Sequence, residues 1–336
     1  MSGLSQKYSN RKSIVQRSVL ISVIIPTYNV AAFIGETLGS VCGQQGVDAL
    51  EILVIDDGSI DDTTAQVEHR AKFDPRIRLA RNAGRKGAAG ARNYGLTLAR
   101  GEWVAFIDGD DLWEPDNLAL KLAAAQQFPE AELISSDFYN ENRFNKTVPR
   151  ADWPKTRQSL LPVWRKNLPP DNGSAAPCRI SDLPIKFICD EMLGHTGTFL
   201  TRRSLLSAAG GFDETLEVGE DVDLWIRLAI RLPFMVYLPQ PLLYYRYRPG
   251  SLTNQDYPAA AFFASVYFRR MLAMPEFAPY RSEIRQRLAR SALAKTYYFR
   301  RQGMRGEAIR SAADSLRFDW GRLESWKNLA AALVFR

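Results

Sequence analysis

The chain of 336 residues has few histidines and few cysteines, and neither type is spaced for metal binding. With only His69 and His195, a histidine-rich metal site is excluded and a local histidine-based catalytic triad is disfavoured. We interpret His195 as a structural residue at the start of a short strand. The three cysteines show no CxxC or zinc spacing, which favours reduced thiols in a cytoplasmic protein.

Long apolar runs and two common nucleotide signatures are also missing. No stretch approaches the roughly 18 uninterrupted apolar residues of a membrane-spanning helix. Residues 1–18 are polar and basic without the apolar segment of a signal peptide, and we expect a disordered tail there. No GxGxxG follows the first expected strand, which disfavours a dinucleotide oxidoreductase, and no GxxxxGK[ST] occurs either.

Basic residues exceed acidic residues by 44 to 37, which gives a net charge of +7. This balance favours an anionic partner, either a diphosphate, an acidic lipid surface or a nucleic acid. The basic residues do not combine with aromatic residues into a nucleic-acid-binding motif. We therefore expect no nucleic-acid partner.

The first half alternates short apolar runs with helical stretches, which predicts an α/β fold with a mostly parallel sheet flanked by helices. A proline-rich stretch over 140–190 has no regular period, and we interpret it as a partly ordered loop. A helix is expected over 220–230, two strands over 234–238 and 242–247, and helices after residue 257. The expected strands of the first half are 19–25, 51–55, 77–80, 103–107 and 133–136, and its expected helices are 31–42, 88–99 and one opened by Pro115.

Three of these strands end in polar clusters, at 26–29, 56–59 and 108–111. Each cluster alone is explained by turn formation. However, ligands of open α/β sheets bind at the carboxyl ends of the strands, and carboxylates that meet there repel one another unless a cation lies among them. Asp108 and Asp110, spaced Asp-x-Asp, offer hard oxygen ligands to Mg²⁺ or Mn²⁺.

Five blocks resemble glycosyltransferase family 2 in order and rough spacing, over residues 19 to 250. The blocks are SVIIPTYN (22–29), VIDDGS (54–59), ARNYG (91–95), FIDGDD (106–111) and GEDVDLW (219–225). The resemblance implies a GT-A fold. Residues 19–137 would form the nucleotide-sugar-binding half, 138–255 the acceptor-binding half with the irregular insertion, and 256–336 a helical extension.

The resemblance also implies an activity. An inverting displacement would move a sugar from a nucleotide diphosphate donor, with a UDP-sugar favoured, to a hydroxyl of a glycan or lipid-linked acceptor. Mn²⁺ or Mg²⁺ would be the cofactor, and surface polysaccharide or glycan biosynthesis the setting. On the donor side, Tyr28 would stack on the base with Pro26, Thr27 and Asn29 beside it, and Asp57 would bond the base edge.

Further roles follow from the later blocks of the resemblance. Arg92 would lie near the nucleotide, Asp108 would reach the ribose or the metal, and Asp110 would coordinate the metal. The general base would be Asp221, whose other interpretation is a carboxylate that complements a helix N-terminus. Glu220 is a candidate contact to the diphosphate or the acceptor.

The chain departs from the family pattern after the last expected strand. Many relatives carry Tyr-Arg-x-His-x-x-Ser there, whereas this chain has YRYRPGS over 245–251. Arg248 replaces the histidine, and a guanidinium binds phosphate bidentately but does not coordinate a metal. Arg246 and Arg248 are therefore candidate diphosphate or acceptor contacts.

Other interpretations stay open at this point. The spacing of carboxylates alone does not exclude a glycosidase-like pair. A catalytically silent nucleotide-sugar-binding or scaffold protein would use the same pocket. The basic C-terminal helices fit a solvated face and a membrane-surface contact about equally, so the expected location is cytoplasmic, with a peripheral position at the inner membrane face as a further option.

Overall fold

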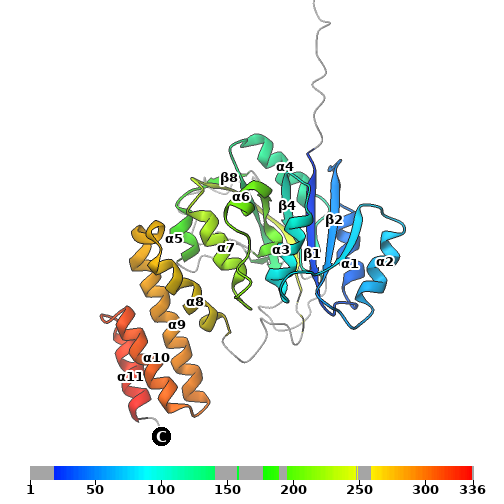
Figure 1. Cartoon of the computed structure of the whole chain (residues 1–336). Helices are drawn as coiled ribbons and strands as arrows, with labels where there is room; N and C mark the ends of the chain where they lie inside the picture. The colour runs from blue at the N-terminus through cyan, green and yellow to red at the C-terminus, as the bar shows by residue number, and fades with distance from the viewer. Residues whose placement is uncertain are drawn as a thin grey trace, which may run out of the picture.

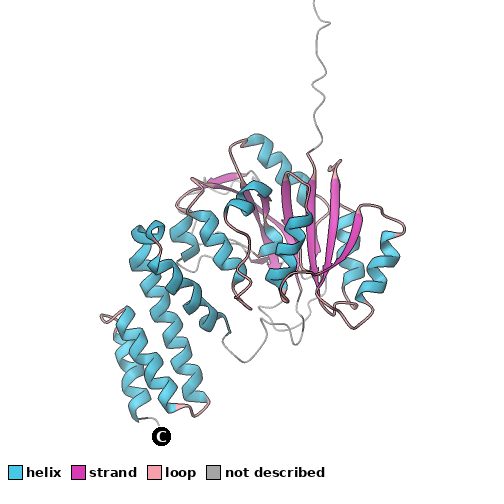
Figure 2. Cartoon of the chain, in the orientation of Figure 1, coloured by secondary structure: helices cyan, strands magenta, loops and turns pink. Residues whose placement is uncertain are grey.

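The computed structural model describes residues 19–140, 157–158, 177–188, 195–246, 248 and 259–334. A ten-stranded sheet with helices on both faces forms the centre, and the last helices extend away from it (Figures 1 and 2). The expected tail over 1–18, most of the insertion over 140–190 and Tyr247 of the last expected strand lie outside the described residues. A mixed sheet covered by helices, with a helical C-terminal region, confirms the expected fold class.

Four parallel strands in the order β3-β2-β1-β4 build the first half of the sheet. Their apolar runs suit strands that are covered on both faces, and alternate residues serve opposite sides. Ile24 packs into the hydrophobic cluster under α3, while Val23 and Ile25 pack into the cluster under α1 and α2. The elements are β1 (Ile21–Thr27), α1 (Ile34–Cys42), β2 (Leu50–Asp56), α2 (Thr63–Ala71), β3 (Ile77–Arg81), α3 (Ala88–Leu98) and β4 (Trp103–Phe106).

The second half of the sheet is mixed. Strand β9 pairs antiparallel with both β4 and β6, while β10 pairs parallel with β6 and antiparallel with β5 and β8. The elements are β5 (Leu112–Trp113), α4 (Asn117–Gln127), β6 (Leu133–Asn140), β7 (Arg157–Gln158), β8 (Cys178–Ile180), α5 (Leu183–Ile188), η4 (Thr196–Thr198), β9 (Leu200–Arg202), α6 (Arg203–Ala208), α7 (Glu220–Ala229) and β10 (Met235–Tyr245).

Three local predictions are wrong. The two strands expected over 234–238 and 242–247 are one strand, β10, whose register shifts around Pro241 because proline has no N–H for the ladder. The expected strand start at His195 is instead the N-cap of the short helix η4. The helix expected to open at Pro115 begins at Asn117.

The expected apolar face of α7 fixes the start of that helix. Trp225 and Ile226 are buried in the core, and the Trp225 ring lies 4.1 Å from the Phe199 ring, centroid to centroid. The helix is preceded by Gly219, whose φ of 84° is in the left-handed region that glycine tolerates. Packing therefore holds the first turn of α7, and with it the two acidic residues that open the helix, in one place.

The C-terminal region is entirely helical over the described residues. Helix α8 joins the main core through Phe268 and Met271, and α9 follows it through Ile284 and Leu288. Within the described residues, no helix combines the length and the apolar character needed to cross a membrane. The helices are α8 (Ala259–Ala273), η6 (Pro275–Tyr280), α9 (Arg281–Arg301), α10 (Arg305–Phe318) and α11 (Leu323–Val334).

Candidate active site

A cavity of about 530 Å³ opens at the carboxyl ends of β1, β2 and β4. The start of α7, helix η4 and the end of β10 close its other side. All of the site residues proposed from the sequence line this one cavity. They are Pro26, Thr27, Tyr28, Asn29, Asp57, Arg92, Asp108, Asp110, Glu220, Asp221, Arg246 and Arg248.

The loop after β1 presents an open aromatic face. Tyr28 is 54% exposed although it lines the cavity. The next residue, Asn29, has a φ of 50°, a conformation that asparagine tolerates better than most residues. Its N–H donates to Ser59 Oγ at 3.0 Å, and its Oδ1 accepts from the Ile60 N–H at 2.9 Å. These bonds tie the loops after β1 and β2 together and hold the ring of Tyr28 at the cavity mouth.

Asp57 is held from two sides. One carboxylate oxygen accepts from Asn82 Nδ2 at 2.6 Å, and the other accepts from the Gly87 N–H at 2.8 Å. The Asp57 N–H donates to Thr27 O at 2.9 Å. The carboxylate is thus oriented before any ligand arrives, while each oxygen keeps acceptor capacity for a base edge.

Arg92 is buried and joins the two sides of the cavity. Its Nη1 donates to Glu220 Oε1 and its Nη2 to Asp108 Oδ1, each at 2.7 Å. Although burial alone would raise the pKa of Asp108, the charges of Arg92 and His195 hold it below its ordinary value. The sequence placed Arg92 next to the nucleotide, and in the structure its paired nitrogens contact these two carboxylates.

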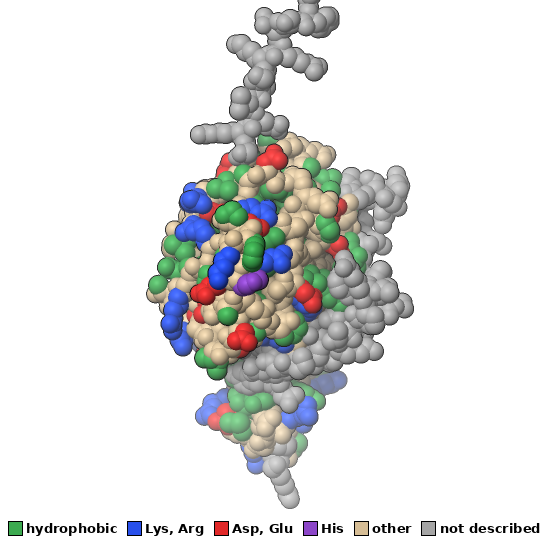
Figure 3. Space-filling model, turned by 90° about the vertical axis from the view of Figure 1, so that its right-hand side faces the viewer, with side chains coloured by type: hydrophobic (Ala, Val, Ile, Leu, Met, Phe, Trp, Pro, Cys, Tyr) green, Lys and Arg blue, Asp and Glu red, His purple; other side chains and the backbone are tan. Residues whose placement is uncertain are grey.

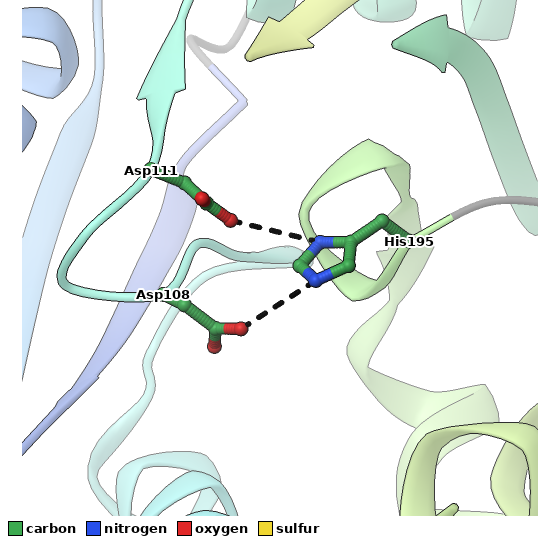
Figure 4. A group of neighbouring side chains, drawn as sticks. All are labelled: Asp108, Asp111 and His195. Atoms are coloured by element: carbon green, nitrogen blue, oxygen red, sulfur yellow. Dashed lines mark ion pairs between the residues drawn. The ribbon is translucent and has the colours of Figure 1, made fainter. Parts of the chain in front are cut away.

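Three carboxylates and one imidazole meet beside the β4 terminus, and we call Asp108, Asp110, Asp111 and His195 the acid cluster. The His195 ring lies between two of the carboxylates, with Nε2 3.7 Å from Asp108 Oδ2 and Nδ1 3.8 Å from Asp111 Oδ2 (Figure 4). Among the described residues, ligand atoms of Asp108, Asp111 and His195 all lie within 4.8 Å of one another.

Sequence reasoning missed His195 and left Asp111 without a role. The signal for Asp111 was available, because it ends the same block as Asp108. His195 gave no such signal, since it is far away in the sequence and a lone histidine is usually structural. Its orientation is fixed by tertiary contacts: Nδ1 accepts from the Gly197 N–H at 3.2 Å, and the ring stacks on Tyr245 at 4.3 Å between centroids.

The acid cluster carries an excess of buried negative charge. Burial and the neighbouring charge of Asp108 raise the pKa of Asp110, and burial with the charges of Asp110 and Asp108 raises the pKa of Asp111 further. Within the part of the chain that the structure describes, the buried Asp111 Oδ2 accepts no hydrogen bond, although Asp111 Oδ1 accepts from the Arg246 N–H at 3.1 Å. A hard divalent cation with oxygen and imidazole ligands fits this donor set.

Two arginines border the acid cluster. Arg248 Nε lies 3.1 Å from Asp110 Oδ2, and the Arg246 guanidinium bonds to Glu36 Oε2 at 2.8 Å and to the Asp110 carbonyl. The residue that replaces the family's histidine therefore contacts the carboxylate that the sequence assigned to the metal.

The two acidic residues that open α7 have different surroundings. Asp221 is half-buried, and its carboxylate accepts from the Val222 N–H at 2.7 Å and from Thr196 Oγ1 at 3.4 Å. Glu220 is buried against Arg92, and burial together with the charge of Asp221 raises its pKa to about 7. Asp221 is therefore the carboxylate that can face an incoming group, whereas Glu220 is engaged inside the protein.

Comparison with known proteins finds a family match for the part of the chain that carries one side of this cavity. Residues 22–183 match the model of glycosyl transferase family 2. The uncharacterized glycosyltransferase EpsJ of Bacillus subtilis is 27% identical over 72% of this chain and 65% of its own length. The succinoglycan biosynthesis protein ExoO of Rhizobium meliloti is 28% identical over 88% of this chain and 81% of its own length.

A third relative has a more specific name. It is the UDP-Glc:alpha-D-GlcNAc-diphosphoundecaprenol beta-1,3-glucosyltransferase WfgD of Escherichia coli, 40% identical over 31% of this chain and 40% of its own length. The high identity is confined to about a third of the chain.

Two solved structures share the fold. TarS 1-349 of S. aureus in complex with UDP-GlcNAc superposes with a TM-score of 0.65 at 19% identity, over 94% of this chain and 90% of TarS 1-349. The mannosyltransferase PcManGT of Pyrobaculum calidifontis, in complex with GDP-Man and Mn²⁺, gives a TM-score of 0.56 at 22% identity, over 96% of this chain and 82% of its own. The matched residues 22–183 carry the loops after β1, β2 and β4 and all three carboxylates of the acid cluster, whereas η4, α7 and the end of β10 lie outside the match.

Proposed function

We propose that this chain is an inverting, metal-dependent glycosyltransferase that moves a sugar from a nucleotide diphosphate to an acceptor hydroxyl in surface polysaccharide or glycan biosynthesis. The observation that carries the proposal is that an open aromatic ring, the Asp108, Asp110 and His195 members of the acid cluster and a half-buried carboxylate line one cavity. The matched family and the names of its relatives support the reaction class.

The donor nucleoside would bind at the mouth of the cavity. Tyr28 offers its exposed ring for stacking, and the held carboxylate of Asp57 can accept from the N–H groups of the base edge. The fold relatives were solved with UDP-GlcNAc and with GDP-Man. We favour a UDP-sugar as donor, and the name of WfgD supports a lipid-linked acceptor for this chain.

The diphosphate would lie against the acid cluster. Asp108, Asp111 and His195 would hold Mn²⁺ or Mg²⁺, with Asp110 as the further carboxylate that the sequence pointed to. When bound there, the cation would supply the positive charge that neutralises the departing diphosphate. Arg248 and Arg246 stand at the same edge and can add charge-assisted hydrogen bonds to phosphate oxygens.

The acceptor hydroxyl would be deprotonated by Asp221. As the acceptor oxygen bonds to the anomeric carbon, its proton passes to the Asp221 carboxylate, and the bond from the anomeric carbon to the diphosphate oxygen breaks on the opposite face. One such displacement inverts the anomeric centre. The hydrogen bonds from the Val222 N–H and Thr196 Oγ1 would hold the carboxylate in position for this proton transfer.

The second candidate is a catalytically silent nucleotide-sugar-binding protein. It would use the same ring and the same acid cluster but would not need Asp221 at the cavity. The presence of this carboxylate beside a paired Glu220 favours the transferase. For the location, we propose a cytoplasmic protein that works at the inner face of the membrane, where a lipid-linked acceptor would be available.

Thermal unfolding and donor turnover test the proposal together. UDP, GDP and dTDP sugars are added with Mn²⁺ or with EDTA, because a ligand that binds only the folded chain raises its melting temperature. We expect a Mn²⁺-dependent rise that is largest for a UDP-sugar, and slow release of UDP in the presence of an acceptor lipid extract. Full turnover in excess EDTA would contradict the metal-dependent mechanism, and binding without any turnover would favour the silent protein.

A further inference from the structure

The outermost helix, α11, presents its large apolar side chains to solvent. Trp320, which precedes the helix, is 78% exposed, Leu323 is 67% exposed and Trp326 is 50% exposed, and Leu333 and Val334 extend the row to the end of the helix. The residues that α11 buries are small, Ser325 and Ala332. We call Trp320, Leu323, Trp326, Leu333 and Val334 the α11 face.

The α11 face has helical regularity and is not a scatter of single residues. Positions 323, 326, 330, 333 and 334 follow the spacing of one helix face, and the exposed Ala330 fills the middle position. The Trp326 Nε1–H donates to the backbone carbonyl of Trp320 at 2.8 Å, which ties the Trp326 indole to the turn before the helix. A contiguous apolar face of this kind usually marks a binding surface.

The surroundings of the face are strongly basic. Residues 259–334 contain 14 Lys and Arg against six Asp and Glu. Exposed basic side chains lie along α10 and α11, among them Arg305, Arg310, Arg317 and Lys327. An occupant of the α11 face should therefore be apolar where it meets the helix and anionic around it.

A second copy of the chain fits these requirements poorly. A two-fold contact would place the α11 face against itself and bring two basic helical regions together. A bilayer with anionic headgroups meets both requirements, because indole and leucine side chains enter the interface while Lys and Arg contact the headgroups. In Figure 1, α11 lies on the far side of the C-terminal helices from the sheet, so this contact would leave the cavity uncovered.

We propose that the α11 face is a membrane-docking surface that binds anionic lipid bilayers with Trp320, Leu323 and Trp326 inserted at the headgroup level. This binding needs neither a sugar donor nor a metal. A failure of the transferase proposal would therefore not affect it, and a failure of docking would leave the transferase intact.

Sedimentation of the full chain with lipid vesicles tests the proposal. The vesicles contain roughly 30% phosphatidylglycerol in phosphatidylcholine, which gives them an anionic surface. We expect the chain to bind these vesicles, to bind pure phosphatidylcholine vesicles little, and to bind less as the salt concentration rises. The double variant Trp320→Gln and Leu323→Gln should reduce the partition coefficient by about 10-fold or more. Both side chains are mostly exposed, so the melting temperature should not change.

The matched control is the double variant Ile60→Gln and Phe73→Gln. These side chains are 90% and 77% exposed but lie in the other part of the molecule, and the variant should bind vesicles like the unmodified chain. Equal binding by both double variants, or equal binding to neutral vesicles, would overturn the proposal. A third result would also overturn it. If the chain does not bind vesicles but light scattering shows an oligomer that the α11 substitutions dissociate, a second copy of the chain covers the face.

Discussion

The part of the chain that carries the cavity and the part that follows it have opposite charge. Residues 19–258 contain 31 acidic and 25 basic residues, whereas residues 259–334 contain six acidic and 14 basic. On the side of the molecule seen in Figure 3, acidic and basic side chains are interspersed over the N-terminal part. The overall charge of +7 therefore says nothing about the cavity, whose most charged feature is an acid cluster.

The sheet with its flanking helices and the outermost helix α11 also differ in which apolar side chains they bury. The sheet and its helices bury their large apolar residues in two clusters, while α11 buries small residues and exposes large ones. This difference teaches that the two parts would meet anionic partners by different means. The first would need a cation between its carboxylates and a diphosphate, and the second would contact anionic headgroups directly through Lys and Arg. Substitutions in one part should leave the function of the other unchanged.

The largest effect is expected at Asp221. Replacing a general base costs about 10²–10⁴-fold in rate, so Asp221→Asn should lower kcat by that factor while donor affinity and vesicle binding stay unchanged. The matched control is Glu220→Gln, which should cost less in kcat. Both are measured by sugar transfer at saturating donor. An active Asp221→Asn enzyme would place the base elsewhere, and a loss of folding would make Asp221 a structural helix-start residue.

The acid cluster gives the next largest effect. Because Asp111 and His195 offer ligand atoms close to those of Asp108, Asp111→Asn and His195→Ala should each weaken Mn²⁺ binding in the presence of UDP by about 100-fold. Calorimetric Mn²⁺ titration checks this without any need for turnover. His69→Ala, at an exposed histidine on α2, is the control and should bind Mn²⁺ normally. Unchanged Mn²⁺ affinity in His195→Ala would return the cation to Asp108 and Asp110 alone.

A smaller effect is expected at the cavity mouth. Tyr28→Ala should weaken every nucleoside diphosphate by about 1–3 kcal/mol, because the exposed ring would no longer stack on the base. Asp57→Ala should instead reduce the preference between bases. Calorimetry with UDP and GDP separates the two results. If neither substitution alters nucleotide affinity, the donor pocket lies elsewhere.

The last effect concerns stability and not binding or rate, at the buried Lys121 in the acidic part. Lys121 on α4 is fully buried, its Nζ has no hydrogen-bond partner among the described residues, and burial lowers its pKa to about 7. An unfolded lysine has a pKa of about 10.4, so the unfolded chain binds more protons between these values and stability rises with pH there. Lys121→Met should therefore stabilise the fold by roughly 1–4 kcal/mol near pH 7, and the gain should vanish above about pH 10.4.

Urea unfolding at several pH values measures this difference. The control is Lys72→Met, at an exposed lysine after α2, which should change stability little at any pH. A Lys121→Met chain that is less stable at every pH would mean that the ammonium has a partner in the folded protein.

The polar ends of the buried strands made most of the site predictable. Apolar runs such as Ile21–Thr27 must lie inside a sheet, and the carboxyl ends of parallel strands meet at one edge. For this reason Tyr28, Asp57 and Asp108 reach one cavity although they come from three different loops. The stripe of α7 likewise predicted a packed helix that presents Asp221. Their roles in catalysis stay predictions.

Only the tertiary structure decided which groups surround each carboxylate. The His195 ring is held in the acid cluster because His195 caps η4 and because Tyr245 stacks on the ring, and no local pattern encodes either contact. In the same way Arg92 bridges Asp108 and Glu220, although Glu220 lies 128 positions from Arg92 in the sequence. Sequence periodicity fixes which face of an element is buried, whereas contacts between distant loops depend on how the elements pack. The sequence by itself therefore determined which strand ends form the site, which Asp residues lie there and that the C-terminal helices are basic. The packing of the elements determined which ion pairs form, that the His195 imidazole joins the acid cluster, and that the large apolar side chains of α11 stay exposed.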